Sequence, residues 1–168
     1  MKKMLCTLVS LSFLSVGIGC ASKQLWMSSP NMEHASNQYF DASISPIYTF
    51  DGYKGFNLYI QNKTTGNLEV EWNNTFYLHK GEKKGGFWFK GIPYADRNKP
   101  RPPSVVKGAP FSKEIYPSSL LYLSTYYAKA WIHESMKAGE NGIYLTIKVD
   151  GNEVTETLTL VFSIQQAK

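Results

Sequence analysis

Three histidines, His34, His79 and His133, are the side chains of this chain best suited to acid–base chemistry near neutral pH. A hydrolytic site would place one of them beside a nucleophile and an orienting acid. The sequence contains no GxSxG motif, and His133-Glu134 lacks the second histidine of a zinc-binding HExxH helix. Isolated histidines are usually surface or capping residues, so we predict no catalytic residue.

Metal and cofactor motifs are missing as well. The acidic residues are scattered, Asp150 is explained by a turn, and no calcium loop of the form DxDxDG occurs. The stretch GEKKGG, residues 81–86, lacks the strand-to-helix context of a phosphate-binding loop and is better explained as a hairpin turn. We therefore predict neither a metal site nor a cofactor.

Positive charge is concentrated in one stretch of the chain. Residues 80–107 contain eight Lys and Arg against Glu82 and Asp96, a net charge of +6, whereas the whole chain carries +5. Aromatic side chains interleaved with basic ones can bind sugars, lipid head groups or anionic polymers. The predicted contact surface consists of Lys83, Lys84, Trp88, Lys90, Tyr94, Arg97, Lys99 and Arg101. The alternative is that the lysines only keep a sheet edge soluble and unpaired.

A proline-rich passage, GIPYADRNKPRPPSVVKG at residues 91–108, carries part of this charge. Pro100, Pro102 and Pro103 fix the backbone angle φ and lack an N–H donor, so we expect an extended, rigid connector rather than sheet. Residues 105–106 are predicted to resume β structure. A need for a rigid connector explains the prolines without any ligand. The basic side chains on this connector remain candidates for binding a partner.

The first twenty residues have the features of an export signal. Lys2 and Lys3 precede an apolar stretch, residues 4–16, that is too short to span a bilayer, and small or apolar residues lead to Cys20. This arrangement resembles a bacterial lipoprotein signal, which implies that residues 1–19 are removed and Cys20 carries fatty acids. The family's sorting rule and Ala21 imply the outer membrane. The alternative is an ordinary secretory signal cut near Gly19 or Ser22.

The rest of the N-terminal region divides at about residue 38. Residues 20–37 are polar and without clear periodicity, so we predict a lipidated N-terminus and flexible tether, followed by one β-sandwich domain at 38–168. Trp26 and Met27 would either enter the membrane interface or pack on the domain. The only cysteines are Cys6 and Cys20, so the mature domain would contain no disulfide. Nucleic acid is excluded as a partner of an exported protein.

Alternating apolar residues predict strands at 56–61, 68–72, 75–78, 86–89, 143–149 and 156–164. Asp150-Gly151 is a favoured hairpin turn between the last two, and 75–78 and 86–89 are expected to form a second hairpin. About seven short strands indicate an all-β, antiparallel, immunoglobulin-like β-sandwich. Residues 117–139 alone show spacings of three and four, which predicts an irregular crossover with one helical turn.

Four stretches carry a resemblance to known proteins: Asn62-Lys63-Thr64, Trp72-Asn73, Ile92 through Val105, and Ile115-Tyr116-Pro117. Together they resemble a loosely defined group of uncharacterised bacterial lipoproteins with an immunoglobulin-like domain. The resemblance implies a fold and a place in the cell envelope, and it brings no activity.

The sequence thus predicts a membrane-anchored, non-enzymatic module that binds an envelope protein, an anionic glycan or an anionic lipid. Two alternatives remain: an envelope hydrolase acting on glycan or peptide through His79 or His133, and a surface lipoprotein of an exclusion or immunity system.

Overall fold

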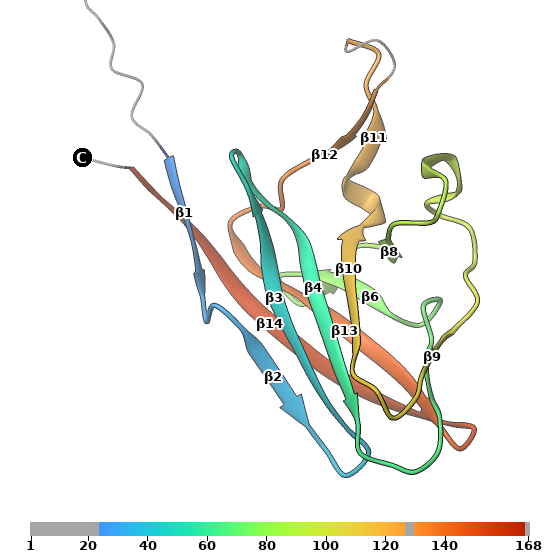
Figure 1. The fold of residues 1–168 in the computed structure, drawn as a ribbon. Coiled ribbons are helices and arrows are strands. Elements are labelled where there is room, and N and C mark those ends of the chain that lie inside the picture. Colours follow the sequence, from blue (N-terminus) through green and yellow to red (C-terminus); the bar gives the residue numbers. More distant parts are fainter. Residues whose placement is uncertain (1–23, 127–129, 167–168) are drawn as a thin grey trace, which may run out of the picture.

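The computed structural model describes residues 24–126 and 130–166 as two antiparallel β-sheets packed face to face, with a two-stranded ribbon projecting at one end (Figure 1). The predicted all-β class is confirmed, and these residues contain no α-helix. None of their helical segments is long and apolar enough to cross a bilayer. The signal at 1–19 and Cys20 lie outside the described residues and stay predictions.

The strands divide between the sheets as follows. The seven-stranded sheet contains β1 (Gln24–Ser29), β14 (Asn152–Gln166), β13 (Gly139–Val149), β5 (Leu68–Val70) and β9 (Ser104–Val106) in that order, with β6 (Phe76–His79) paired to β13 and β7 (Glu82–Lys83) paired to β6. The five-stranded sheet has the order β2 (Glu33–Ser36), β3 (Phe40–Thr49), β4 (Gly52–Asn62), β10 (Phe111–Pro117) and β8 (Phe87–Trp88). Strands are thus more numerous than the seven predicted.

One hydrophobic core fills the space between the two sheets. The alternating residues Phe56, Leu58 and Ile60 of β4 are all fully buried. They form one cluster with the inward residues of β13 and β14, among them Leu145 and Phe162. The inward faces predicted from alternation are therefore correct for the long strands, whose apolar side chains point into the core from one face.

The predicted hairpin between β13 and β14 is confirmed. Asp150 and Gly151 both have positive φ, 49° and 81°, as a two-residue type I′ turn requires. The second predicted hairpin is wrong in its partner: β6 turns back at Lys80-Gly81 to pair with β7. Phe87–Trp88 instead pairs with β10 in the opposite sheet.

The predicted crossover at 117–139 contains the expected helical turn, a 3₁₀ turn at Ser118–Leu120. It also contains a feature that the helical spacing concealed. Leu121–Leu123 (β11) and Trp131–His133 (β12) pair as a separate ribbon, which Figure 1 shows beyond the end of the sandwich.

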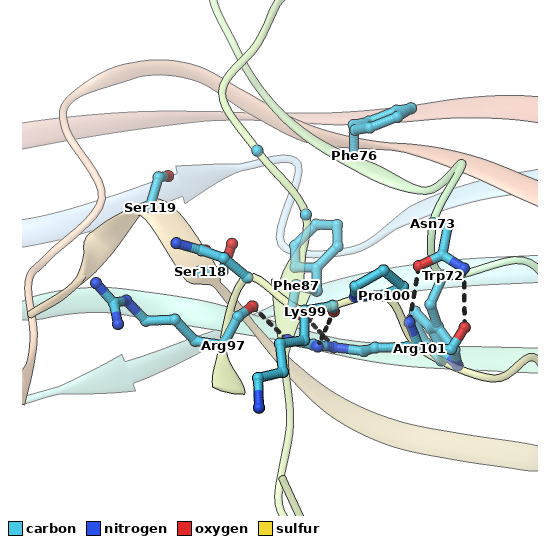
Figure 2. A pocket seen from close by; sticks show the side chains of 13 residues that line it. Trp72, Asn73, Phe76, Phe87, Arg97, Lys99, Pro100, Arg101, Ser118 and Ser119 are labelled. Atoms are coloured by element: carbon cyan, nitrogen blue, oxygen red, sulfur yellow. Dashed lines mark hydrogen bonds between the residues drawn. The ribbon is translucent and has the colours of Figure 1, made fainter. Parts of the chain in front are cut away.

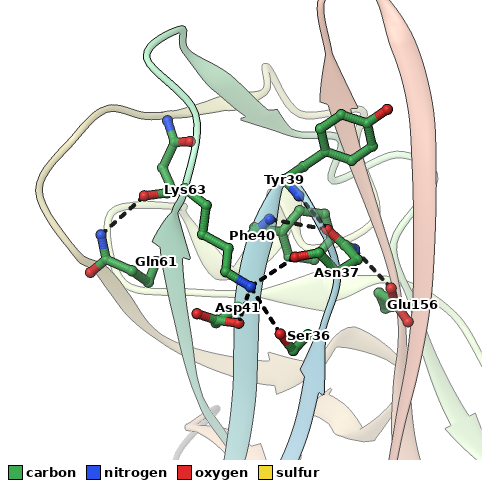
Figure 3. A network of polar contacts seen from close by, with 9 residues as sticks. Ser36, Asn37, Tyr39, Phe40, Asp41, Gln61, Lys63 and Glu156 are labelled. Carbon is green, nitrogen blue, oxygen red and sulfur yellow. Dashed lines mark hydrogen bonds and ion pairs between the residues drawn. The ribbon is translucent and has the colours of Figure 1, made fainter.

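The flexible tether predicted for residues 20–37 is wrong from Gln24 onward. Residues 24–29 pair with β14, and residues 33–36 pair with β3. The chain after β2 is also held by side chains (Figure 3): Asn37 donates to Glu156 of the opposite sheet at 2.8 Å, and Lys63 contacts Asp41 at 2.7 Å. Trp26 packs against the core, so the domain begins well before residue 38.

A fully buried asparagine, Asn141 on β13, joins three parts of the seven-stranded sheet. Its amide nitrogen donates to the carbonyl oxygens of Lys137 and Gly139 at 2.8 and 2.9 Å. Its Oδ1 accepts from the Tyr77 hydroxyl at 2.6 Å and lies 3.2 Å from His79 Nδ1. Burial raises the pKa of Tyr77, which keeps the hydroxyl proton available for this bond.

Candidate binding groove

The proline-rich loop is built around Arg101, which is buried rather than exposed as predicted for a contact residue. Its guanidinium donates to main-chain carbonyls on both sides of the loop: Phe87 at 2.9 Å, Lys99 at 2.8 Å, Arg97 at 2.5 Å and Asp96 at 3.4 Å. Guanidinium has five N–H donors and suits this convergence of acceptors. Arg101 is therefore an internal support of the loop.

Asn73 holds the same loop from the other side. Its side-chain amide accepts from the Arg101 main-chain N–H at 2.8 Å and donates to the Arg101 carbonyl at 2.9 Å (Figure 2). The chain then enters β9, so β structure resumes at Ser104–Val106, close to where it was predicted. The connector interpretation of the loop is thus supported, with Arg101 and Asn73 as its braces.

Three hollows lie beside this loop, and two of them are larger than the third, which has a volume of about 280 Å³. The smaller of these two, shown in Figure 2 and of about 470 Å³, is lined by Arg97, Lys99 and Arg101 together with residues of the chain before β8. Its three cations already have partners: Arg97 lies 4.9 Å above the Trp131 ring, Lys99 pairs with Asp96 at 2.8 Å, and Arg101 holds the loop carbonyls. An anion in this hollow would compete with each of these contacts.

The other hollow is a groove of about 690 Å³ between the β3–β4 hairpin and the β11–β12 ribbon. Phe50 and Lys54 line it from the hairpin, and His133 lines it from the ribbon. Trp88 and Tyr116 line it from the five-stranded sheet. Its volume is within the usual range of ligand sites.

A ladder of stacked rings supports one wall of this groove, and two of its members, Trp88 and Tyr94, line the groove directly. Tyr94 stacks on Trp88 with ring centroids 4.6 Å apart and on Trp131 at 5.5 Å, and the Arg97 guanidinium lies over the Trp131 ring at 4.9 Å from its centroid. Trp88, predicted as a contact residue, is only 8% exposed, and its indole N–H donates to the Ile92 carbonyl at 2.8 Å. Stacking fixes Tyr94 and the loop at 94–97 against the sheet.

His133 closes the aromatic wall. Its Nε2 lies 3.2 Å from the Tyr94 hydroxyl, and its ring contacts Tyr116 edge-on at 4.9 Å. Burial, and to a smaller degree the positive charge of Lys54, lowers the pKa of His133. The imidazole is therefore neutral at neutral pH and can both donate and accept in the groove.

This pKa shift predicts a pH dependence of stability. Because the unfolded chain takes up the His133 proton first, the folded state should lose stability as pH falls below about 6.5, the ordinary histidine pKa. Urea unfolding followed at about pH 7.5 and about pH 5 should show this loss, and His133→Gln should reduce it. The matched change His34→Gln, at an exposed histidine of β2, is the control for the loss of one imidazole. An equal loss in the His133→Gln protein would contradict the assignment.

The rim of the groove carries charges of both signs. Lys90 is exposed and has no hydrogen bond or ion pair with residues 24–126 and 130–166. Opposite charge comes from Glu114, which accepts from the Tyr116 hydroxyl at 3.0 Å. Burial and this bond raise the pKa of Tyr116 to about 12. Asp51 and Lys54 form an ion pair at 2.6 Å, so Lys90 is the cation most available to a ligand.

The structure therefore divides the predicted contact surface. Trp88, Lys90 and Tyr94 line the groove, and Arg97 supports its wall. Lys83 lies elsewhere, with its ammonium 4.5 Å above the Phe76 ring and 4.3 Å above Tyr144, and Lys84 pairs with Glu82. Lys99 faces the smaller hollow and Arg101 is buried.

Sequence reasoning did not place Tyr116 or Trp131 at the site, and it considered His133 only as a histidine of the alternative hydrolase. The sequence contains one indication of this arrangement. Tyr116 lies just before the crossover at 117–139, Trp131 and His133 lie near its end, and the chain folds back so that the three residues meet. In the described residues no group of three or more His, Cys, Asp or Glu is arranged to hold a metal ion. The side chains that hydrogen-bond His79 and His133 are Asn141 and Tyr94, not carboxylates.

Comparison with protein-family models gives no match, and neither curated proteins nor solved structures contain a match to this chain.

Proposed function

We propose that this chain is a lipid-anchored, non-enzymatic binding module of the bacterial cell envelope and that the groove is its ligand site. The observation that carries the proposal is the ladder Trp88–Tyr94–Trp131–Arg97, which holds one wall of the groove in a fixed shape before any ligand arrives. The two antiparallel sheets and their crossovers are compatible with an immunoglobulin-like sandwich, the class that we propose for the domain.

The membrane anchor is supported by the N-terminal sequence. Positive residues, a short apolar stretch and Cys20 follow one another as in lipoprotein signals, and Ala21 favours the outer membrane. Replacing Cys20 by Ala should abolish incorporation of labelled fatty acid and release the protein into the soluble fraction. Unchanged membrane association of the Cys20→Ala protein would contradict the anchor.

The ligand class that suits the groove best is an anionic glycan. The faces of Trp88 and Tyr94 are stacked on neighbouring rings, so these residues offer their ring edges as apolar contacts for a sugar, and neutral His133 and the Tyr hydroxyls can exchange hydrogen bonds with sugar hydroxyls. Lys90, exposed at the rim, suits a phosphate or carboxylate on the glycan. A charged envelope glycan also agrees with the compartment that the signal predicts.

Charge reversal at Lys90 tests this assignment. The full chain, purified in detergent, would be titrated with a phosphorylated and with a neutral envelope oligosaccharide, and binding followed by tryptophan fluorescence. Lys90→Glu should weaken binding of the phosphorylated glycan about tenfold or more, the effect of losing one charged hydrogen bond. Lys107→Glu makes the same charge change at an exposed lysine outside the groove and should have little effect. Equal weakening by both variants would contradict the site.

The samples from the same titration also test the alternative that the protein is a hydrolase. The observation that favours this alternative is the position of His133 in the groove. Chromatography of the glycan after incubation should show it intact. Shortened products that disappear with His133→Ala would overturn the non-enzymatic proposal.

A further inference from the structure

Exposed apolar side chains gather at one end of the sandwich. Figure 1 shows that the β3–β4 tip, the β11–β12 ribbon, the start of β1 and the end of β14 all lie at this end, drawn at the top. Of the large hydrophobic residues exposed in the described chain, eight of twelve belong to these four segments. Phe50 at the hairpin tip and Tyr126 on the ribbon are each 95% exposed.

The opposite end has a different chemistry. Its β13–β14 turn presents exposed Asp150 and Asn152, and the loop between β4 and β5 presents Thr65 and Asn67. Single exposed apolar side chains are common on protein surfaces and need no explanation. Their concentration at one end of the domain needs one.

The chain itself connects the apolar end to the position of the proposed lipid. Cys20 precedes the first residue of β1, Gln24, by four residues, and four residues span at most about 14 Å. If Cys20 is acylated, as proposed above, β1 therefore begins within about 14 Å of the bilayer surface. The end with Phe50 and Tyr126 is the end held there.

We propose that this end of the sandwich contacts the bilayer that holds the lipid, with Phe50 and Tyr126 inserted at the boundary between head groups and acyl chains. Aromatic side chains favour this region of a membrane. The two residues stand on separate projecting hairpins rather than on one flat patch. A fluid bilayer accepts such separated tips, whereas a protein partner would need a surface shaped to both.

The cysteine content makes a direct test practical. If Cys6 leaves with the signal and Cys20 is acylated, a new cysteine is the only thiol of the mature chain. Phe50→Cys, Tyr126→Cys and Asn152→Cys proteins would be labelled with an environment-sensitive dye and reconstituted in phosphatidylglycerol–phosphatidylethanolamine vesicles. Dyes at 50 and 126 should shift to the blue and be quenched by a bromine-labelled lipid, and the dye at 152 should do neither.

The outcomes distinguish this inference from the anchor on which it rests. A vesicle-bound, acylated protein whose dyes at 50 and 126 behave like that at 152 overturns the membrane contact and leaves the anchor. A chain with its natural Cys20 that incorporates no labelled fatty acid overturns the anchor, and quenching of the dyes at 50 and 126 in a Cys20→Ser chain produced without residues 1–19 then shows that the contact stands without it. Dyes shielded in whole cells but not quenched in vesicles would show that a protein covers this end, and would also overturn the contact.

Discussion

Replacing Arg101 by Met should lower the free energy of unfolding by about 3 kcal/mol or more. Methionine keeps an unbranched aliphatic chain but leaves the carbonyl oxygens of Phe87, Lys99 and Arg97 without their donor. Hydrogen bonds to charged groups contribute about 1.5–3 kcal/mol each, and water entering the loop would recover part of the loss. The melting temperature should fall by roughly 6–12 °C in a domain of this size.

Two further variants make this result specific. Arg97→Met is the same change at a neighbouring arginine whose guanidinium covers a ring, and it should cost about 1 kcal/mol or less. Arg101→Lys keeps the charge, but one ammonium group cannot reach acceptors on several sides. This variant should therefore lose most of the stabilisation that the Arg101 guanidinium contributes. If Arg101→Met unfolds no earlier than Arg97→Met, Arg101 does not support the loop.

Replacing Asn141 by Leu should cost about 3 kcal/mol. Leucine has a similar shape, but it leaves the buried Tyr77 hydroxyl and the carbonyls of Lys137 and Gly139 unpaired. An unsatisfied buried polar group costs about 1–3 kcal/mol, and three groups lose their partner together. Urea unfolding at neutral pH would measure the change, with Asn67→Leu in an exposed loop as the control of near-zero effect.

A double-mutant cycle isolates the Tyr77–Asn141 bond. Tyr77→Phe removes the hydroxyl that donates a hydrogen bond to Asn141. In the otherwise natural chain, this change should lower the free energy of unfolding by about 1 kcal/mol or more. In the Asn141→Leu background the same change should cost little or restore stability, because the hydroxyl has no partner to lose. Additive costs would contradict a direct energetic link between the two side chains.

The sequence predicted those parts of the fold that depend on neighbouring residues. Alternation identified the buried faces of β4, β13 and β14, and Asp150-Gly151 identified their hairpin, because both signals act within a few residues. The strand pairing of residues 87–88 could not be predicted in the same way. Gly85, with φ of 117°, allows the chain to leave β7, and the partner Tyr116–Pro117 comes nearly thirty residues later.

For the candidate site, the sequence predicted some of the residues but not how they are arranged. Lys90 and Tyr94 were identified as contact residues, and both line the groove. Trp88 was also predicted as a contact residue, yet it is buried, because β8 is only two residues long and the loop at 92–94 covers it. The burial of Arg101 depends on carbonyls that converge from both sides of a loop, a property that residue types do not reveal.

Arg101 grips its loop through main-chain oxygens, which every amino acid supplies. Arg97 is not free to change, because its guanidinium packs on Trp131 in the ladder. At positions 98 and 99 the path of the main chain depends on Arg101 and Asn73 more than on the side chains present, since the Lys99–Asp96 ion pair is largely exposed. Variants could therefore exchange these two residues, which line the smaller hollow, while the shape of the loop stays constant. A randomised library at positions 98 and 99 is thus a practical starting point for engineering new specificities.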